Sequence, residues 1–211
     1  MKSPCHFADR AEAAGLLADK LQGYRGQHPL VLAIPRGAVP MAKIIAERLD
    51  GELDVVLARK LGAPYNPEYA IGAVVEGGWV YLAPETEMLR LDQSWVAQET
   101  ERQLATIEQR RRRYTPLKKP VDPADRVVII VDDGLATGAT MIAALHALRT
   151  KNPAELVCAI PVAALDSLGK VSPLADTVVC LCAPDNFQAV GEFYAHFPQV
   201  EDEEVEAILG K

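Results

Sequence analysis

The chain has 211 residues, 49% of them hydrophobic, and carries a formal net charge of -7. This length allows one full core, so we expect residues 1–211 to form a single domain. The acidic charge argues against nucleic acid as a partner. Residues 1–22 are too polar for a signal peptide, and no apolar run approaches the length of a membrane span. We therefore expect a cytoplasmic protein without a membrane partner.

The cysteines lack the spacing of a zinc site and of a CxxC redox pair. They are Cys5, Cys158, Cys180 and Cys182, and all but the first stand in apolar runs. Cysteine in such runs usually behaves as a small buried hydrophobic residue. The sequence therefore predicts reduced, structural thiols.

The N-terminal part of the chain alternates helical and apolar segments. The spacing of apolar residues predicts a helix over residues 9–21, capped by Asp9. Residues 29–35 form an apolar run that is typical of a strand buried on both faces. A helix is expected over about residues 40–49, followed by a second strand over 53–58.

Cations follow both of these strands. Arg36 and Gly37 come directly after the first strand, and Arg59 and Lys60 come at the end of the second. Both pairs would lie at the carboxyl ends of parallel strands, where open α/β sheets bind ligands. A guanidinium group also offers a forked donor to an anion. Taken alone, Arg36 is equally explained as a strand end that faces water. For Arg59 and Lys60 a solvated strand end is the less favoured alternative.

Residues 61–69, LGAPYNPEY, contain two prolines and a glycine and are too long for a tight turn. We predict a surface loop here, in which Glu68 and Tyr69 have no assigned role. Residues 70–75 and 79–82 flank a Glu-Gly-Gly turn, and this pattern predicts a β-hairpin.

A long helix is predicted over residues 94–114, and it ends in the basic run Arg110 to Arg113. Cations are favourable at a helix C-terminus, so a solvated, well-capped helix end is the preferred interpretation. The alternatives are a charged lid near a polyphosphate, an oligomer contact and an RNA-binding patch.

The most informative stretch is residues 126–141, RVVIIVDDGLATGATM. Its apolar residues predict a buried strand that ends in Asp132 and Asp133, and helical spacing begins after the loop. The small loop residues let backbone N–H groups converge on an anion at the helix N-terminus, and Thr137 and Thr140 add hydroxyl donors. The carboxylates can accept hydrogen bonds from vicinal hydroxyls or lie near a hydrated divalent cation. A phosphate beside a diol describes a ribose 5-phosphate, and a simple helix-capping turn is the alternative.

The C-terminal part continues the alternation. Strands are expected over residues 156–161 and 177–182, with a helical turn over 166–170 between them, and residues 201–206 are acidic. Buried strands that alternate with helices predict an α/β fold with an open, doubly wound parallel sheet.

The stretch DDGLATGAT after an apolar run resembles the 5-phosphoribosyl 1-pyrophosphate (PRPP) signature of the type I phosphoribosyltransferases. As a whole, the chain looks most like bacterial predicted phosphoribosyltransferases of unassigned acceptor. The resemblance implies a Rossmann-like core over about residues 27–195, a flexible flap at 61–69 and a small variable hood. The N-terminal helix, the helical insertion at 85–120 and the C-terminal tail are the segments that could form this hood.

The resemblance also implies an activity, namely displacement of pyrophosphate from PRPP by a nitrogen nucleophile, expected to be a nucleobase. Mg²⁺ is the implied cofactor, held mainly by PRPP and without an assigned protein ligand. The implied catalytic residues are Asp132, Asp133, Lys60 and Arg36. The implied PRPP-binding residues are Asp132, Asp133, Gly134, Leu135, Ala136, Thr137, Gly138, Ala139, Thr140, Arg36, Gly37, Arg59 and Lys60. The partners would be PRPP and a small-molecule acceptor, and a homodimer is left open.

The acceptor is less well defined. A PD-x-F segment after the last strand resembles one that supplies an aromatic face in purine-salvage members of the family. It implies that Phe187 stacks on the acceptor and that Asp185 shapes the loop, although Phe187 is equally explained as a plug under the loop. Members that act on 6-oxopurines carry an acid where this chain has Ala136, so that general base is missing.

Fold resemblance alone leaves two other classes open. One is a PRPP- or nucleotide-binding regulatory protein without transferase activity. The other is an RNA-associated protein that uses the basic helix, against which the net acidic charge counts.

Overall fold

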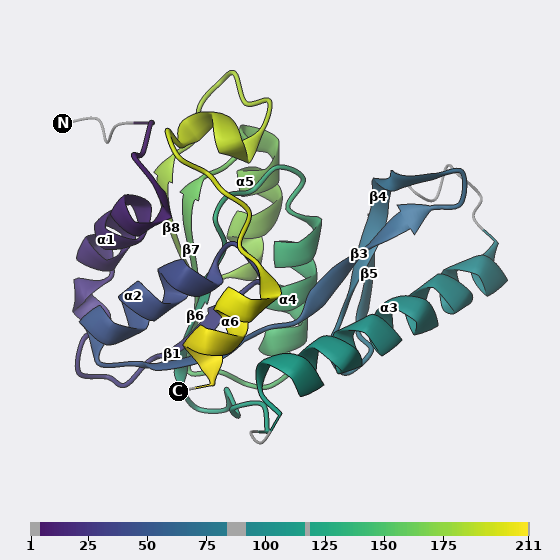
Figure 1. Cartoon of the computed structure of the whole chain (residues 1–211), viewed down its shortest axis with the longest axis horizontal. Coiled ribbons are helices and arrows are strands. Elements are labelled where there is room, and N and C mark those ends of the chain that lie inside the picture. Colours follow the sequence, from purple (N-terminus) through teal and green to yellow (C-terminus); the bar gives the residue numbers. More distant parts are fainter. Residues whose placement is uncertain (1–4, 84–91, 117–118, 211) are drawn as a thin grey trace.

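The computed structural model describes residues 5–83, 92–116 and 119–210, with the backbone alone for residues 67–70. Its main body is a five-stranded parallel sheet in the order β2-β1-β6-β7-β8 (Figure 1). The strands are β1 (Leu30–Ala33), β2 (Glu52–Val55), β6 (Val127–Val131), β7 (Glu155–Val162) and β8 (Thr177–Cys182). The central strands are buried along nearly their whole length, which explains their uninterrupted apolar sequences.

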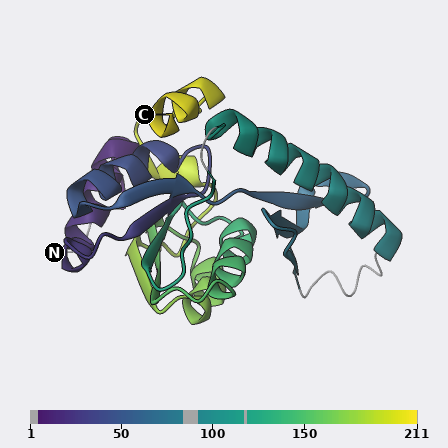
Figure 2. The ribbon, with the colours of Figure 1, turned by 90° about the horizontal axis from the view of Figure 1, so that it is seen from below.

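Helices cover both faces of this sheet, because side chains alternate between the faces along each strand. Val31 and Ile129 contribute to the core on one face, and Leu32 and Ile130 contribute to the core on the other. The helices on the first face are α1 (Arg10–Lys20) and α2 (Val39–Leu49), and those on the second are α4 (Ala139–Arg149) and α5 (Leu165–Val171). Figure 2 shows the two layers on either side of the sheet. The predicted doubly wound α/β fold is confirmed.

A second, antiparallel sheet and a long helix form an arm that projects beside the main sheet (Figure 1). Its elements are β3 (Ala58–Ala63), β4 (Asn66–Val75), β5 (Val80–Leu82) and α3 (Gln93–Tyr114). The C-terminal helix α6 (Asp202–Leu209) contacts both α2 and α3. The predicted hairpin around residues 76–78 is confirmed as β4 and β5. Within the described ranges, none of the helices combines the length and the apolar character needed to cross a bilayer.

Two predictions in this region were wrong. Residues 61–69 do not form a loop, because they belong to β3 and β4 and the turn between them covers only residues 64–65. The pairing shifts register between Leu61 and Ala63, so a strand with irregular pairing accommodates the glycine and the prolines that suggested a loop. The side chains of Glu68 and Tyr69 lie outside the described residues. The predicted strand 53–58 is divided, since β2 ends at Val55 and β3 begins at Ala58.

The prediction for the cysteines was wrong for one pair, because Cys5 and Cys182 form a disulfide. The N-terminal segment runs beside the C-terminal one, and the Phe7 N–H donates to the Phe193 carbonyl at 2.8 Å. This pairing brings Cys5 to the end of β8, a contact that cysteine spacing cannot reveal. Cys158 and Cys180 are free thiols.

Candidate active site

The loop between β6 and α4 opens onto a cavity of about 570 Å³ where the arm meets the carboxyl ends of the main strands. Most of the residues that the PRPP signature implied line this cavity. They are Arg59, Lys60, Asp132, Asp133, Gly134, Leu135, Ala136, Thr137, Gly138, Ala139 and Thr140. Segments distant in sequence therefore share one cavity, with acids, cations and a glycine-rich loop around it.

The loop has a shape that suits an anion. Gly138, with a φ of 74°, is the N-cap of α4. No side chain of the described residues caps this helix, so its first N–H groups are available to a ligand. Leu135 forms a parallel bridge with Ala163, and the Ser167 hydroxyl donates to the Ala136 carbonyl at 2.6 Å. These contacts hold the loop against β7 and α5 and leave its N–H donors available.

The two acids at the tip of β6 differ in their surroundings. Asp132 accepts a hydrogen bond from the Asp133 backbone N–H at 2.8 Å, and the pKa of Asp132 is raised by burial and by the charge of Asp133. Lys60 and Arg10 oppose this shift. Burial also raises the pKa of Asp133, whereas Arg10 opposes the shift directly by donating from Nε at 3.0 Å and from Nη2 at 2.9 Å to Asp133 Oδ2. Asp133 is thus an ion-paired carboxylate, and Asp132 is the acid with more capacity for a ligand.

Arg10 is a site residue that the sequence analysis missed. It comes from α1, its guanidinium carbon lies 3.7 Å from the centroid of the Phe197 ring, and it donates to the Pro198 carbonyl at 2.6 Å. The Tyr194 hydroxyl donates to the Asp133 carbonyl at 2.7 Å. The N- and C-terminal segments together hold Asp133, and no local sequence signal links residues so far apart.

Arg36 and Gly37 follow β1 together, but Arg36 is directed to the C-terminal segment whereas Gly37 lies against Asp133. Arg36 Nη1 lies 3.2 Å from Glu201 Oε2 and 3.7 Å from Asp202 Oδ1, so α6 and the residue before it hold this guanidinium outside the cavity lining. Gly37 packs directly against Asp133, since a Cβ on Gly37 would lie 1.9 Å from Asp133 Oδ2. Only a glycine permits this approach.

The residues implied for the acceptor are not brought to the cavity. Phe187 stacks on Phe193, with ring centroids 5.4 Å apart and an interplanar angle of 22°, and packs against the core. Asp185 is exposed, and neither residue is part of the cavity lining. The geometry corresponds to the alternative in which Phe187 is a plug under the loop.

The opposite wall of the cavity comes from the arm and was also missed. Glu99, Arg102 and Gln103 on α3 line it together with Arg59 on β3. Glu99 accepts hydrogen bonds from Arg102 Nε at 2.8 Å and from Gln103 Nε2 at 2.7 Å, and Gln103 in turn accepts one from Arg59 Nε. In sequence these are ordinary polar positions of an exposed helix, so only the packing of α3 against β3 reveals them.

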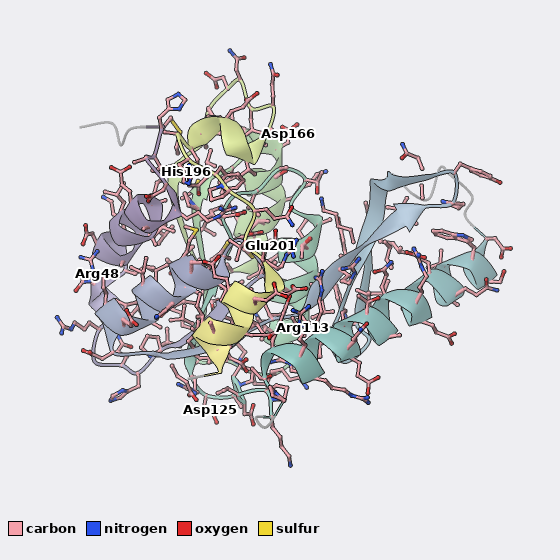
Figure 3. All side chains as sticks on the ribbon, in the orientation of Figure 1. Arg48, Arg113, Asp125, Asp166, His196 and Glu201 are labelled. Carbon is pink, nitrogen blue, oxygen red and sulfur yellow. A yellow bond between two sulfur atoms is a disulfide. The ribbon has the colours of Figure 1, made fainter. Side chains whose placement is uncertain are left out.

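The basic run at the end of α3 is not a uniformly solvated helix end, as the preferred interpretation had it. Arg111 is largely buried and pairs with Asp54 at 2.9 Å and with Glu76 at 2.6 Å. Arg113 pairs with acids of α6, which Figure 3 shows beside it. Arg112 behaves as predicted, because it is exposed and pairs with Glu108 on its own helix. The run therefore attaches α3 to the main sheet and to α6.

Comparison with known proteins shows the family to which the chain belongs. The model of the phosphoribosyl transferase domain matches residues 8–197. The chain therefore belongs to the phosphoribosyl transferase family, and the resemblance stated for DDGLATGAT is confirmed.

The similar proteins differ in sequence identity and in the share of their own length that matches. A Mycobacterium tuberculosis (strain H37Rv) protein named "Putative phosphoribosyl transferase Rv0571c" is 37% identical over 206 residues, which cover 97% of this chain and 46% of that protein. The chain thus spans about half the length of the curated relatives it matches. The crystal structure of TT1426 from Thermus thermophilus is 45% identical, with a TM-score of 0.83 over 97% of both chains. A Neisseria gonorrhoeae protein solved with bound ppGpp shares the fold at 12% identity and a TM-score of 0.53, over 97% of this chain and 93% of that one.

Proposed function

We propose that the protein transfers the phosphoribosyl group of PRPP to a nitrogen nucleophile. The nucleophile attacks carbon 1 of the ribose, the bond from that carbon to the diphosphate oxygen breaks, and pyrophosphate leaves. The observation that supports the proposal is one cavity lined by Asp132, Asp133, the loop of residues 134–140, Arg59 and Lys60. Each part of PRPP, namely phosphate, diol and diphosphate, meets groups of suitable charge there.

In the proposed mechanism the chain acts by positioning and by electrostatics. The N–H groups at the start of α4 bind the 5-phosphate, and Asp132 accepts hydrogen bonds from ribose hydroxyls. The same carboxylate stabilises the positive charge that develops on the ribose ring, and Lys60 and Arg59 neutralise the charge on the departing pyrophosphate. The proximity of Lys60 and Arg10 to Asp132 favours the carboxylate form that this role needs.

Magnesium fits this site as an ion held chiefly by the donor. Among residues 5–83, 92–116 and 119–210 no three His, Cys, Asp or Glu side chains are grouped as a metal site. Mg²⁺ needs fewer protein ligands, because it is commonly bound by one or two carboxylates together with substrate phosphates. Asp132 is the residue that could contribute, and the ion would neutralise diphosphate charge.

The acceptor in this proposal is a nitrogen compound, expected to be a nucleobase. Ala136 offers no general base in the phosphate loop, and Phe187 is stacked on Phe193 and not directed to the cavity. The base-handling residues implied by purine-salvage relatives are therefore absent from the cavity lining. Recognition of the acceptor has to come from other residues.

Calorimetry with PRPP and Mg²⁺ tests the donor site. The Asp132→Asn/Asp133→Asn variant should bind at least about tenfold more weakly, because hydrogen bonds to charged groups contribute ~1.5–3 kcal/mol each. Asp19→Asn, an exposed acid on α1 that pairs with Arg48, is the matched control and should bind as wild type does. Unchanged affinity in the double variant would contradict the site assignment. Release of pyrophosphate over a panel of purines, pyrimidines and amines then tests catalysis.

A regulatory role is the second candidate, because Arg10 already occupies Asp133 Oδ2. A carboxylate that is engaged in this way has fewer lone pairs for a ribose diol. The Neisseria protein with bound ppGpp shows that this fold can hold a nucleotide. Tight PRPP binding without pyrophosphate release for any acceptor would favour this candidate.

A further inference from the structure

The arm places a pair of guanidinium groups on the wall of the cavity that faces the phosphate loop. Arg59 comes from β3 and Arg102 from α3, and both line the cavity. A chain of hydrogen bonds fixes them, from Arg102 and Gln103 to Glu99 and from Arg59 to Gln103. Glu99 is 9% exposed, so this network is anchored by a nearly buried carboxylate.

These guanidinium groups keep unused donors. Arg102 donates to Glu99 through Nε and Nη2, which leaves Nη1 without a protein acceptor in the described parts of the chain. Arg59 uses only Nε there, so its Nη1 and Nη2 groups remain available. Among the described residues no buried side-chain donor lacks a partner, so the remaining Nη groups of the half-buried Arg59 reach solvent. The Arg102 side chain is 69% exposed.

The wall is also crowded with positive charge. The pKa of Arg59 is lowered by burial and by the neighbouring charges of Arg110 and Arg102. Glu99 offsets only part of this repulsion, and its carboxylate is already occupied by Arg102 and Gln103. Cations that repel one another at an open cavity are stabilised by a bound anion.

We propose that Arg59 and Arg102 form an anion subsite, oriented by Glu99 and Gln103, on the arm side of the cavity. The inference rests on the proposed function, because the anion would belong to a substrate of the same cavity. Two groups could supply this anion. One is the diphosphate of the donor, and the other is an acidic group on the acceptor. Glu201 and Asp202 hold Arg36, the guanidinium group of the loop after β1, outside the cavity lining. The arm therefore supplies guanidinium groups that the loop after β1 does not.

Calorimetry on the full chain tests the subsite with probes for each source. The first experiment uses inorganic pyrophosphate with Mg²⁺. The second experiment compares the binding of orotate with that of uracil, both in the presence of ribose 5-phosphate. Arg102→Gln should weaken the binding of either pyrophosphate or orotate about tenfold, which is the loss expected when one charge-assisted hydrogen bond is removed. Arg112→Gln, on the same helix but paired with Glu108 and 77% exposed, should leave both affinities unchanged.

Each outcome decides the inference. Weaker pyrophosphate binding identifies the donor diphosphate, and weaker orotate binding with unchanged uracil binding identifies an acidic acceptor. Equal affinities of wild type and Arg102→Gln for every probe would overturn the subsite. Binding of ribose 5-phosphate depends on the phosphate loop and not on Arg102. If ribose 5-phosphate binds but the variant behaves as wild type, the subsite fails while the proposed function stands. Because Arg102 is mostly exposed, its replacement should leave the fold intact, and Arg59→Gln provides a second variant.

Discussion

Replacing Arg111 by methionine should lower the free energy of unfolding by about 3–5 kcal/mol, the usual cost of removing one partner from a buried ion pair. The Arg111 side chain is 12% exposed and pairs with Asp54 and Glu76, whose side chains are 7% and 29% exposed. It also donates to the Val55 carbonyl at 2.9 Å. Methionine fills a similar volume but leaves the Asp54 carboxylate buried without its cation. The attachment of α3 to β2 and to the hairpin should weaken as a result.

Urea unfolding followed by far-UV circular dichroism measures this loss. For a domain of this size, 1 kcal/mol corresponds to a shift of ~2–4 °C in Tm, so the Tm should fall by about 6–20 °C. Arg112→Met is the matched control, because it makes the same replacement at the next position, where the arginine side chain is 77% exposed. It should lower the free energy of unfolding by less than about 1 kcal/mol. Similar unfolding free energies for the two variants would refute the view that Arg111 anchors the arm.

Two variants of the central loop test its packing and its charge. In Gly134→Ala the new Cβ would lie 2.6 Å from Val190 Cγ1, so the variant should lose ~1–3 kcal/mol, and Gly134→Ala/Val190→Ala should recover part of it in urea unfolding. No recovery would show that the contact is not the cause. Burial and Asp133 raise the pKa of Asp132, so ionisation of Asp132 costs more in the folded protein than in the unfolded chain. Asp132→Asn should therefore be more stable than wild type at pH 7 although it binds PRPP less well. This gain should shrink as the pH falls through the raised pKa and vanish below about pH 3, and a gain that persists there would contradict the argument.

The parts of the site that the sequence predicts are local. A strand buried on both faces, two acids at its tip and a loop of small residues lie within residues 126–141, and the backbone alone brings them together. Arg59 and Lys60 stand at the start of the antiparallel strand β3, three residues or more after the parallel strand β2 ends, and both line the same cavity. The family resemblance rests on the same stretch, which is why the phosphoribosyl transferase family was predictable.

The parts that the sequence does not predict depend on packing between distant segments. Arg10 reaches Asp133 across 123 positions, and Glu99 and Arg102 reach the cavity only because α3 packs against β3. Arg36 follows the parallel strand β1, as predicted, yet Glu201 and Asp202 hold its guanidinium outside the cavity lining. The segment 61–69 was mistaken for a loop because strand pairing with an irregular register leaves no alternating pattern.

The ion pair between Arg10 and Asp133 has an electrostatic consequence for the donor. Two adjacent carboxylates at the tip of β6 would repel a phosphate ester at short range, because both half-buried side chains line the cavity. Arg10 compensates the charge of Asp133 and leaves Asp132 as the uncompensated acid on this side. The single remaining charge is enough to orient a diol and to stabilise a cationic ribose ring. Under the proposed function, Arg10 would thus favour the approach of a polyanionic donor through its contact with Asp133. Its hydrogen bonds are to Asp133 and to the Pro198 carbonyl, and not to the loop proposed to bind the phosphate.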